Sequence, residues 1–204
     1  NLKGDNVMAA LVNILASAVG SLTNPTKLAN TFCSNGIHVS DKTIGAYIAY
    51  LIDAFFISKA ERYDIKGKKY IASPFKYYFT DVGLRNAQLN FRQQEENHIM
   101  ENIIYNELLI RGFNVDVGVV EVIRKRPEVD FVCNRGNQRY YIQSAFAIPD
   151  SDKMKQETNS LVRIRDSFKK IIVVKDRIKL WRNEEGIVVM GIMDFLLNPN
   201  SLDL

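Results

Sequence analysis

Apolar residues in the first part of the chain recur at the spacing of one helix face, at Val7, Leu11, Ile14, Leu15 and Ala18. This spacing predicts an amphipathic helix over residues 7–19. The stretch superficially resembles a signal peptide, but its helical period and the lack of a starting methionine favour a helix of the folded protein. It is also shorter than the roughly 20 apolar residues that cross a bilayer, so we expect no membrane partner.

Two further helices are marked by their first residues. Asn24 is a favourable N-cap and Pro25 suits the first turn, which predicts a helix from there to Cys33. Ser40 in the same way predicts the start of a third helix, which ends near Phe55. The second and third helices, joined by a glycine-containing turn, form a helix-turn-helix pattern.

A β-hairpin is predicted after the third helix. Residues 56–63 and 70–72 have the composition of strands, and the turn between them, 64–69, contains one glycine and three lysines. Three helices followed by such a hairpin are the elements of a winged-helix domain, and the hairpin would be its wing.

The end of this first region is also marked in the sequence. A further strand is predicted over 76–79, and it leads into a short helix that Thr80 or Asp81 can cap. The polar segment that follows lacks a sustained apolar period. We therefore predict two domains, 1–88 and 89–204.

The second domain is predicted to begin with a strong helix and to continue with a sheet. The expected elements are a helix over 95–111, strands over 115–122, 128–133 and 140–147, a helix over 151–167, strands over 170–174 and 187–192, and a final helix over 194–197. The core order is αβββαβ. The continuous apolar run at 170–174 fits a strand covered on both faces, and the helix before it favours a parallel partner strand.

Composition narrows the class of protein only a little. The chain has 204 residues, of which 47% are hydrophobic and 25% charged, as in ordinary globular proteins. Cys33 and Cys133 lie far apart in the sequence without a paired Cys or His, so we expect neither a zinc site nor a disulfide, and a reducing, cytoplasmic setting. Basic residues outnumber acidic ones by 11 to 6 within residues 1–92, which is compatible with an anionic partner.

Three blocks carry a resemblance to a known family: Lys76-Tyr-Tyr-Phe-Thr-Asp-Val-Gly-Leu-Arg85, Glu101-Asn-Ile-Ile-Tyr-Asn-Glu-Leu108 and Glu128-Val-Asp-Phe-Val132. They resemble the region that follows the ATPase domain in prokaryotic AAA+ ATPases. The resemblance implies an α+β protein, with an N-terminal winged helix before an α/β restriction-endonuclease-like domain of the PD-(D/E)XK type, with an αβββαβ core and a mixed sheet.

The resemblance also implies partners and cofactors. The chain would act together with its own AAA+ domain, and that absent N-terminal half would bind ATP. The phosphate-binding motif Gly-x-x-x-x-Gly-Lys-Ser/Thr does not occur here, so we expect no ATP site and no cofactor in this fragment.

In the nuclease superfamily, a carboxylate on the first helix, an Asp on the second strand and a Glu-x-Lys pair on the third strand bind Mg²⁺ and activate water. The resemblance places Glu101 and Asp130 at the first two positions. At the third position stand Gln143 and Ala145, which offer a neutral oxygen and no cation. The resemblance therefore implies a degenerate, non-catalytic site.

Two other interpretations of these carboxylates stay open. Glu128 shares the strand face of Asp130 by the period of two, and it is a substitute ligand if Glu101 and Asp130 do bind Mg²⁺ in a working nuclease. Alternatively, Glu101 is an ordinary helix carboxylate, and Asp130 is a strand-edge residue paired with an arginine such as Arg139.

A winged helix commonly places its third helix in the DNA major groove and its wing on phosphates. On that helix Lys42 and Tyr50 are candidate contacts, but the helix has no Arg, Asn or Gln for bidentate base recognition. The predicted wing offers the better phosphate footprint, with Lys66, Lys68 and Lys69. These lysines would equally keep an edge hairpin soluble.

The preferred hypothesis is a non-catalytic C-terminal module of an AAA+ ATPase that binds nucleic acid, or docks a partner protein, through its winged helix. The alternatives are a Mg²⁺-dependent nuclease and a purely structural interaction or oligomerisation module. A second basic cluster, Arg124-Lys125-Arg126, is predicted close to the nuclease-like cleft.

Overall fold

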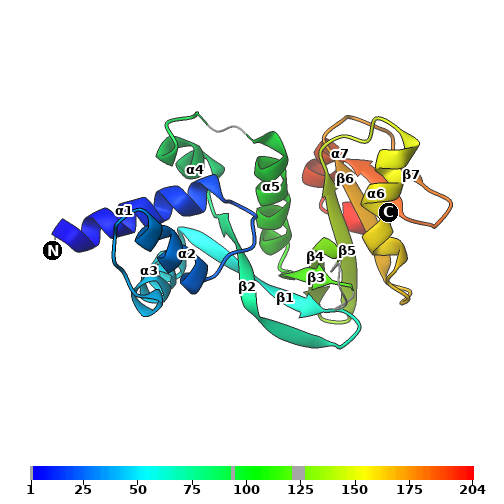
Figure 1. Ribbon diagram of the computed structural model, residues 1–204. Coiled ribbons are helices and arrows are strands. Elements are labelled where there is room, and N and C mark those ends of the chain that lie inside the picture. Colours follow the sequence, from blue (N-terminus) through cyan, green and yellow to red (C-terminus); the bar gives the residue numbers. More distant parts are fainter. Residues whose placement is uncertain (1, 93–94, 121–126) are drawn as a thin grey trace. The chain divides into compact units, whose positions relative to one another are not determined.

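The computed structural model describes residues 2–92, 95–120 and 127–204 (Figure 1). The cluster at Arg124–Arg126 therefore lies outside the described residues. The fold is a mixed α+β fold, and its contacts divide the chain into two compact units. Unit 1 comprises residues 1–60 and 73–102, and unit 2 comprises residues 61–72 and 103–204. No observation tests the predicted domain boundary at residue 88, which stays a prediction.

The helices of unit 1 follow the predicted signals. They are α1 (Leu2–Ser17), α2 (Pro25–Ser34), α3 (Asp41–Asp53) and α4 (Val82–Gln88). The Asn24 side chain accepts a hydrogen bond from Lys27 N at 2.8 Å, and the Ser40 hydroxyl accepts one from Thr43 N at 3.1 Å. Asp81 caps α4 through Gly83 N at 2.6 Å. The predicted helix starts are thus confirmed, except that α1 begins earlier, at Leu2.

Two strands follow α3, namely β1 (Ile57–Asp64) and β2 (Lys69–Phe79). The prediction of separate strands over 70–72 and 76–79 was wrong, because β2 is continuous through Pro74. Pro74 is tolerated there because β2 is the first strand in the sheet order, where a missing N–H interrupts the fewest ladder bonds.

The remaining elements are α5 (Glu96–Ile110), β3 (Asn114–Val119), β4 (Glu128–Arg135), β5 (Gln138–Ala145), α6 (Ser151–Val162), β6 (Lys169–Val174), β7 (Trp181–Arg182), β8 (Val188–Gly191), α7 (Ile192–Leu197) and a short 3₁₀ helix (Ser201–Asp203). They confirm the order αβββαβ. The helix predicted to reach residue 167 ends at Val162, and a local turn follows in which Phe168 N donates to Asp166 Oδ1. The two-residue strand β7 was missed because it is too short to show a period.

The strands form one mixed sheet in the order β2-β1-β3-β4-β5-β6-β8-β7. β4 pairs antiparallel with β3 and β5, whereas β6 pairs parallel with β5 and β8. The parallel partner predicted for residues 170–174 is thus confirmed. Within unit 2, Arg62–Asp64 of β1 pair parallel with Val117–Val119 of β3, so the distal part of the predicted wing belongs to the sheet.

The core of unit 2 lies between α6 and one face of the sheet. Leu161 of α6 and Ile164 just after it pack with Val132, Tyr141 and Ile172 from three neighbouring strands. The neighbours of Ile172 on β6 are fully buried too, as expected for a strand covered on both faces. Within the described residues, no helix has both the length and the apolar character to cross a bilayer.

Unit 1 holds its last strand in place with a buried side-chain amide. Asn102 of α5 is 1% exposed. Its Oδ1 accepts from Phe79 N at 2.9 Å, and its Nδ2 donates to Phe79 O at 2.7 Å. The amide therefore satisfies both backbone groups of Phe79, as a neighbouring strand would.

Candidate functional site

Glu101 lies on α5 in unit 1, where it is held by two neighbours on β2. Its Oε1 accepts from Lys76 Nζ at 2.8 Å and from Tyr78 Oη at 2.6 Å. The side chains of Lys76 and Glu101 are 9% and 13% exposed, so this is a buried ion pair. Gly20 leaves room for it, because a Cβ there would lie 3.1 Å from Glu101 Oε1.

Asp130 and Gln143 lie in unit 2 on adjacent strands, and the structure brings them together. Asp130 N donates to Gln143 Oε1 at 3.4 Å, and Ser144 N donates to Asp130 Oδ2 at 3.0 Å. The regular backbone pairing of β4 with β5 extends only as far as Phe131 and Ile142. The two side chains thus replace backbone bonds at the point where the ladder stops.

Glu128 is held by a buried arginine. Arg62 Nη2 donates to Glu128 Oε1 at 2.7 Å, and the arginine side chain is only 3% exposed. Glu128 and Asp130 are half-buried and flank the fully buried Val129, as the period of two predicts. Arg139, proposed as a partner of Asp130, donates to Asn134 Oδ1 at 2.7 Å and lies over the ring of Tyr63.

The three predicted metal ligands therefore each have protein donors. These donors, which engage one oxygen of each carboxylate, compete with a divalent ion for the negative charge and so weaken Mg²⁺ binding. Across the described ranges, no three His, Cys, Asp or Glu side chains gather in a group suited to a metal ion. No observation tests the assignment of Glu101, Asp130 and Gln143 as catalytic residues.

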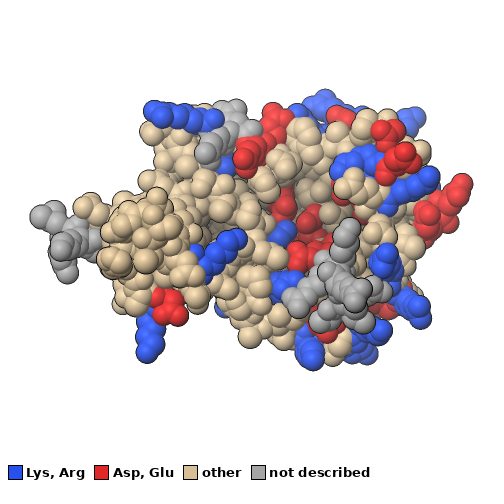
Figure 2. Space-filling model, viewed as in Figure 1, with Lys and Arg blue, Asp and Glu red and all other residues tan. Residues whose placement is uncertain are grey.

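The predicted nucleic-acid contacts are all solvent-exposed. On α3, Ile44 and Ile48 are buried while Lys42 and Tyr50 face solvent, as the helical period predicts. The face over α1–α3 seen in Figure 2 carries few charged side chains, whereas basic side chains gather along the lower edge of unit 2, over the turn between β1 and β2.

That turn has a fixed conformation. Gly67 N donates to Asp64 Oδ1 at 2.8 Å, and a Cβ at Gly67 would lie 2.4 Å from Asp64 Oδ2, so any other residue there would force the Asp64 side chain to move. The predicted contacts Lys66 and Lys68 are exposed on this turn, and Lys69 is exposed at the first position of β2. The hairpin tip thus presents three positive charges next to a hydrogen-bonded turn.

Unit 2 also contains a basic pocket that the sequence patterns did not predict. The pocket has a volume of about 280 Å³ and is lined by Ile65, Lys66, Lys68, Val120, Arg163, Ile164, Arg165 and Asp166. The two arginines went unnoticed because the predicted helix over 151–167 placed them on a helix surface. In the structure they follow α6, next to the tip of the hairpin.

A second missed residue is Asp116 on β3. It is 7% exposed, and its Oδ2 accepts a hydrogen bond from Tyr70 Oη at 3.2 Å. The pKa of Asp116 is raised to about 6, mainly by burial and also by the charge of Glu61, against the lowering effects of the Tyr70 bond and of Arg139. The sequence signal for this site was a carboxylate between the two valines at 115 and 117.

We expect Asp116→Asn to stabilise the protein at neutral pH. The pKa of the carboxyl group lies above its unfolded value of 3.8, so the folded protein binds more protons between about pH 4 and 6. Its contribution to stability is therefore fully present below pH 4 and lost as pH rises through 6. Asp116→Asn should gain about 2 kcal/mol at pH 7.5 and almost nothing at pH 4, measured by urea denaturation. An equal gain at both pH values would contradict this account.

The chain is similar to a family of unknown function and to two uncharacterised proteins. Residues 3–95 match the model of a family described as Domain of unknown function (DUF8612). An uncharacterised protein of Haemophilus influenzae is 35% identical over 198 residues, which cover 96% of this chain and 47% of that protein. An uncharacterised protein of Methanocaldococcus jannaschii is 30% identical over 146 residues, or 72% of this chain and 32% of that protein. No solved structure matches significantly.

Proposed function

We propose that this chain is a non-catalytic module of an AAA+ ATPase, and that it binds nucleic acid through the basic tip of a winged-helix hairpin. The observation that carries the proposal is the hairpin tip, where a hydrogen-bonded turn exposes Lys66 and Lys68 and the first residue of β2 exposes Lys69. Exposed lysines are suited to contact the phosphate groups of a nucleic acid. Such contacts depend on charge and do not depend on the base sequence.

The engaged carboxylates support a non-catalytic role. Glu101 and Glu128 are each held by a cation, and Asp130 accepts a backbone N–H at the end of a strand ladder. A metal-dependent nuclease needs these oxygens for its ion. The closeness of Asp130 and Gln143 on adjacent strands is what favours the alternative, a Mg²⁺-dependent nuclease.

The place of the chain in a larger protein is part of the proposal. The chain spans 47% and 32% of the two relatives it matches, so each relative has a further region long enough for a domain. An ATPase domain in that region would couple ATP hydrolysis to the nucleic-acid contact made here. The order of three helices and a hairpin in α1, α2, α3, β1 and β2 fits the winged-helix assignment.

We expect the wild-type chain to bind a labelled DNA duplex with an affinity that falls steeply with salt, because released counterions drive the contact. Lys66→Ala/Lys68→Ala/Lys69→Ala should weaken binding at least tenfold and reduce the slope of log K against log salt by about 2 to 3. Fluorescence anisotropy from 50 to about 200 mM salt measures both effects.

The control variant removes lysines elsewhere on the surface. Lys155→Ala/Lys175→Ala/Lys179→Ala changes three exposed lysines, lowers the net charge equally and should change affinity less than threefold. An equal loss in both variants, or salt-independent binding, would favour the interaction-module alternative. Plasmid cleavage in Mg²⁺ that Asp130→Ala abolishes would replace the proposal with the nuclease.

A further inference from the structure

We infer that the pocket between the hairpin tip and the end of α6 is a phosphate-binding site, and that it takes a phosphodiester group of a nucleic acid. The inference deepens the proposed function and rests on it for the source of the phosphate. It assigns the contact to one place in unit 2 and adds Arg163 and Arg165, which the winged-helix interpretation does not include.

The hairpin side of the pocket is anchored by a buried residue. Ile65 is 9% exposed, belongs to the core cluster of unit 2, and donates its N–H to Val119 O at 3.0 Å. Lys66 and Lys68 follow it on the exposed side of the turn. Lys68 has a φ of 51°, in the left-handed region that non-glycine residues rarely adopt, so the turn holds this lysine in a costly conformation.

The opposite side is anchored in the same way. Ile164 is 4% exposed, belongs to the same core cluster, and its carbonyl oxygen accepts from Lys170 Nζ at 2.6 Å. Its two sequence neighbours, Arg163 and Arg165, are exposed. Two buried isoleucines therefore fix two basic segments to one core, so the cations around the pocket do not depend on a flexible loop.

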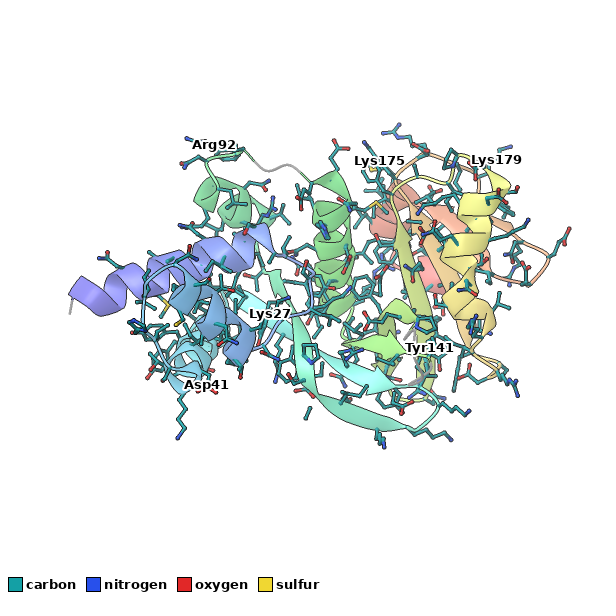
Figure 3. All side chains as sticks on the ribbon, in the orientation of Figure 1. Lys27, Asp41, Arg92, Tyr141, Lys175 and Lys179 are labelled. Carbon is teal, nitrogen blue, oxygen red and sulfur yellow. The ribbon has the colours of Figure 1, made fainter. Side chains whose placement is uncertain are left out.

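The charges around the pocket are strongly unbalanced. Four basic side chains and one carboxylate line it. That carboxylate, Asp166, is already engaged, because Tyr141 Oη donates to its Oδ2 at 2.5 Å and Phe168 N to its Oδ1 at 3.2 Å. Tyr141, labelled in Figure 3, lies on β5 beside α6. Because both oxygens of Asp166 already accept hydrogen bonds from the protein, Asp166 neutralises little of the positive charge of the four basic side chains.

The residue types favour phosphate over other anions. Arginine presents a planar set of N–H donors that matches two phosphate oxygens, and lysine adds a compact charge. The pocket lining also includes three apolar residues, Ile65, Val120 and Ile164, which suit contact with a sugar or base edge beside the phosphate. A nucleotide unit combines both features, whereas free phosphate uses only the cations.

The test measures binding of a labelled single-stranded DNA oligonucleotide by fluorescence anisotropy at low salt. We expect Arg163→Ala/Arg165→Ala to raise Kd about tenfold and to reduce the salt slope by about 1 to 2. The matched control is Lys155→Ala/Lys179→Ala, which removes two exposed charges outside the pocket and should change Kd less than threefold. Circular dichroism melting checks that all variants are folded.

Single substitutions separate this inference from the proposed function. The pocket is lined by Lys66 and Lys68 but not by Lys69. We therefore expect Lys68→Ala to weaken binding more than Lys69→Ala. If both lysines matter equally and the two arginines have no effect, the hairpin binds DNA but the pocket is overturned.

A second probe covers the case in which the chain binds no DNA. Inorganic pyrophosphate is titrated while protein stability is followed. If pyrophosphate then raises the melting temperature of wild type but not of Arg163→Ala/Arg165→Ala, this result would support the phosphate site and reject the nucleic-acid function. No stabilisation by pyrophosphate together with no DNA binding would overturn both. Poly-glutamate that competes as well as DNA would assign the pocket to an acidic protein.

Discussion

Asn102→Ala is expected to destabilise the protein by about 4 kcal/mol. The buried amide serves both backbone groups of Phe79, and alanine leaves the N–H and the C=O without these partners in a place that water does not reach. Each buried polar group that loses its hydrogen bond costs about 1–3 kcal/mol. The lost side-chain packing adds to this cost. Urea denaturation followed by circular dichroism gives the free energy of unfolding for comparison with wild type.

The control for Asn102 lies on the same helix. Asn97 of α5 is exposed, and Asn97→Ala should change stability by no more than about 0.5 kcal/mol. Asn102→Asp separates hydrogen bonding from packing, because it keeps the size of the side chain but replaces the donor to Phe79 O with an acceptor. If Asn102→Asp were as stable as wild type, the bond from Asn102 Nδ2 to Phe79 O would not help to hold β2 in place.

Much of the fold could be predicted from local signals. Asn24 and Ser40 cap helices where the sequence placed them, because an N-cap depends only on the residues of the next turn. The continuous strand β2 could not be predicted, since Pro74 signals a break unless the strand is known to lie at an edge. Pairing of β1 with β3 depends on residues more than 50 positions apart, and no local pattern encodes it.

The candidate site was less predictable than the fold. The resemblance placed Asp130 and Gln143 on the second and third strands of the nuclease-like core, and the structure brings the two residues together. The hydrogen bonds that their side chains make at the end of the β4–β5 ladder depend on the register of these strands, which the sequence does not reveal. The pocket beside Lys68 was missed for a related reason. Its arginines become neighbours of the hairpin only because α6 ends early and Ile164 enters the core.

The largest effect at a predicted site residue is expected for the pair of Lys76 and Glu101. Lys76→Met should cost about 3–5 kcal/mol, because it leaves the buried carboxylate without its compensating charge. Lys76→Met/Glu101→Gln should recover most of that loss, since the neutral amide can still accept the bond from Tyr78. A double-mutant cycle in urea measures the coupling. The exposed pair of Lys155 and Asp152 is the control, and Lys155→Met should cost less than about 1 kcal/mol.

The Glu101→Gln variant also distinguishes a structural carboxylate from a metal ligand, when its melting temperature is measured with and without Mg²⁺. A ligand set that binds Mg²⁺ only in the folded state would raise the melting temperature as Mg²⁺ is added, and Glu101→Gln would abolish that rise. An ion pair instead predicts that millimolar Mg²⁺ changes neither wild type nor Glu101→Gln beyond general salt effects. Coupling between Lys76 and Glu101 together with no response to Mg²⁺ is therefore the expected result. Stabilisation by Mg²⁺ that requires both Glu101 and Asp130 would instead identify a metal site that uses both carboxylates, as a working nuclease does.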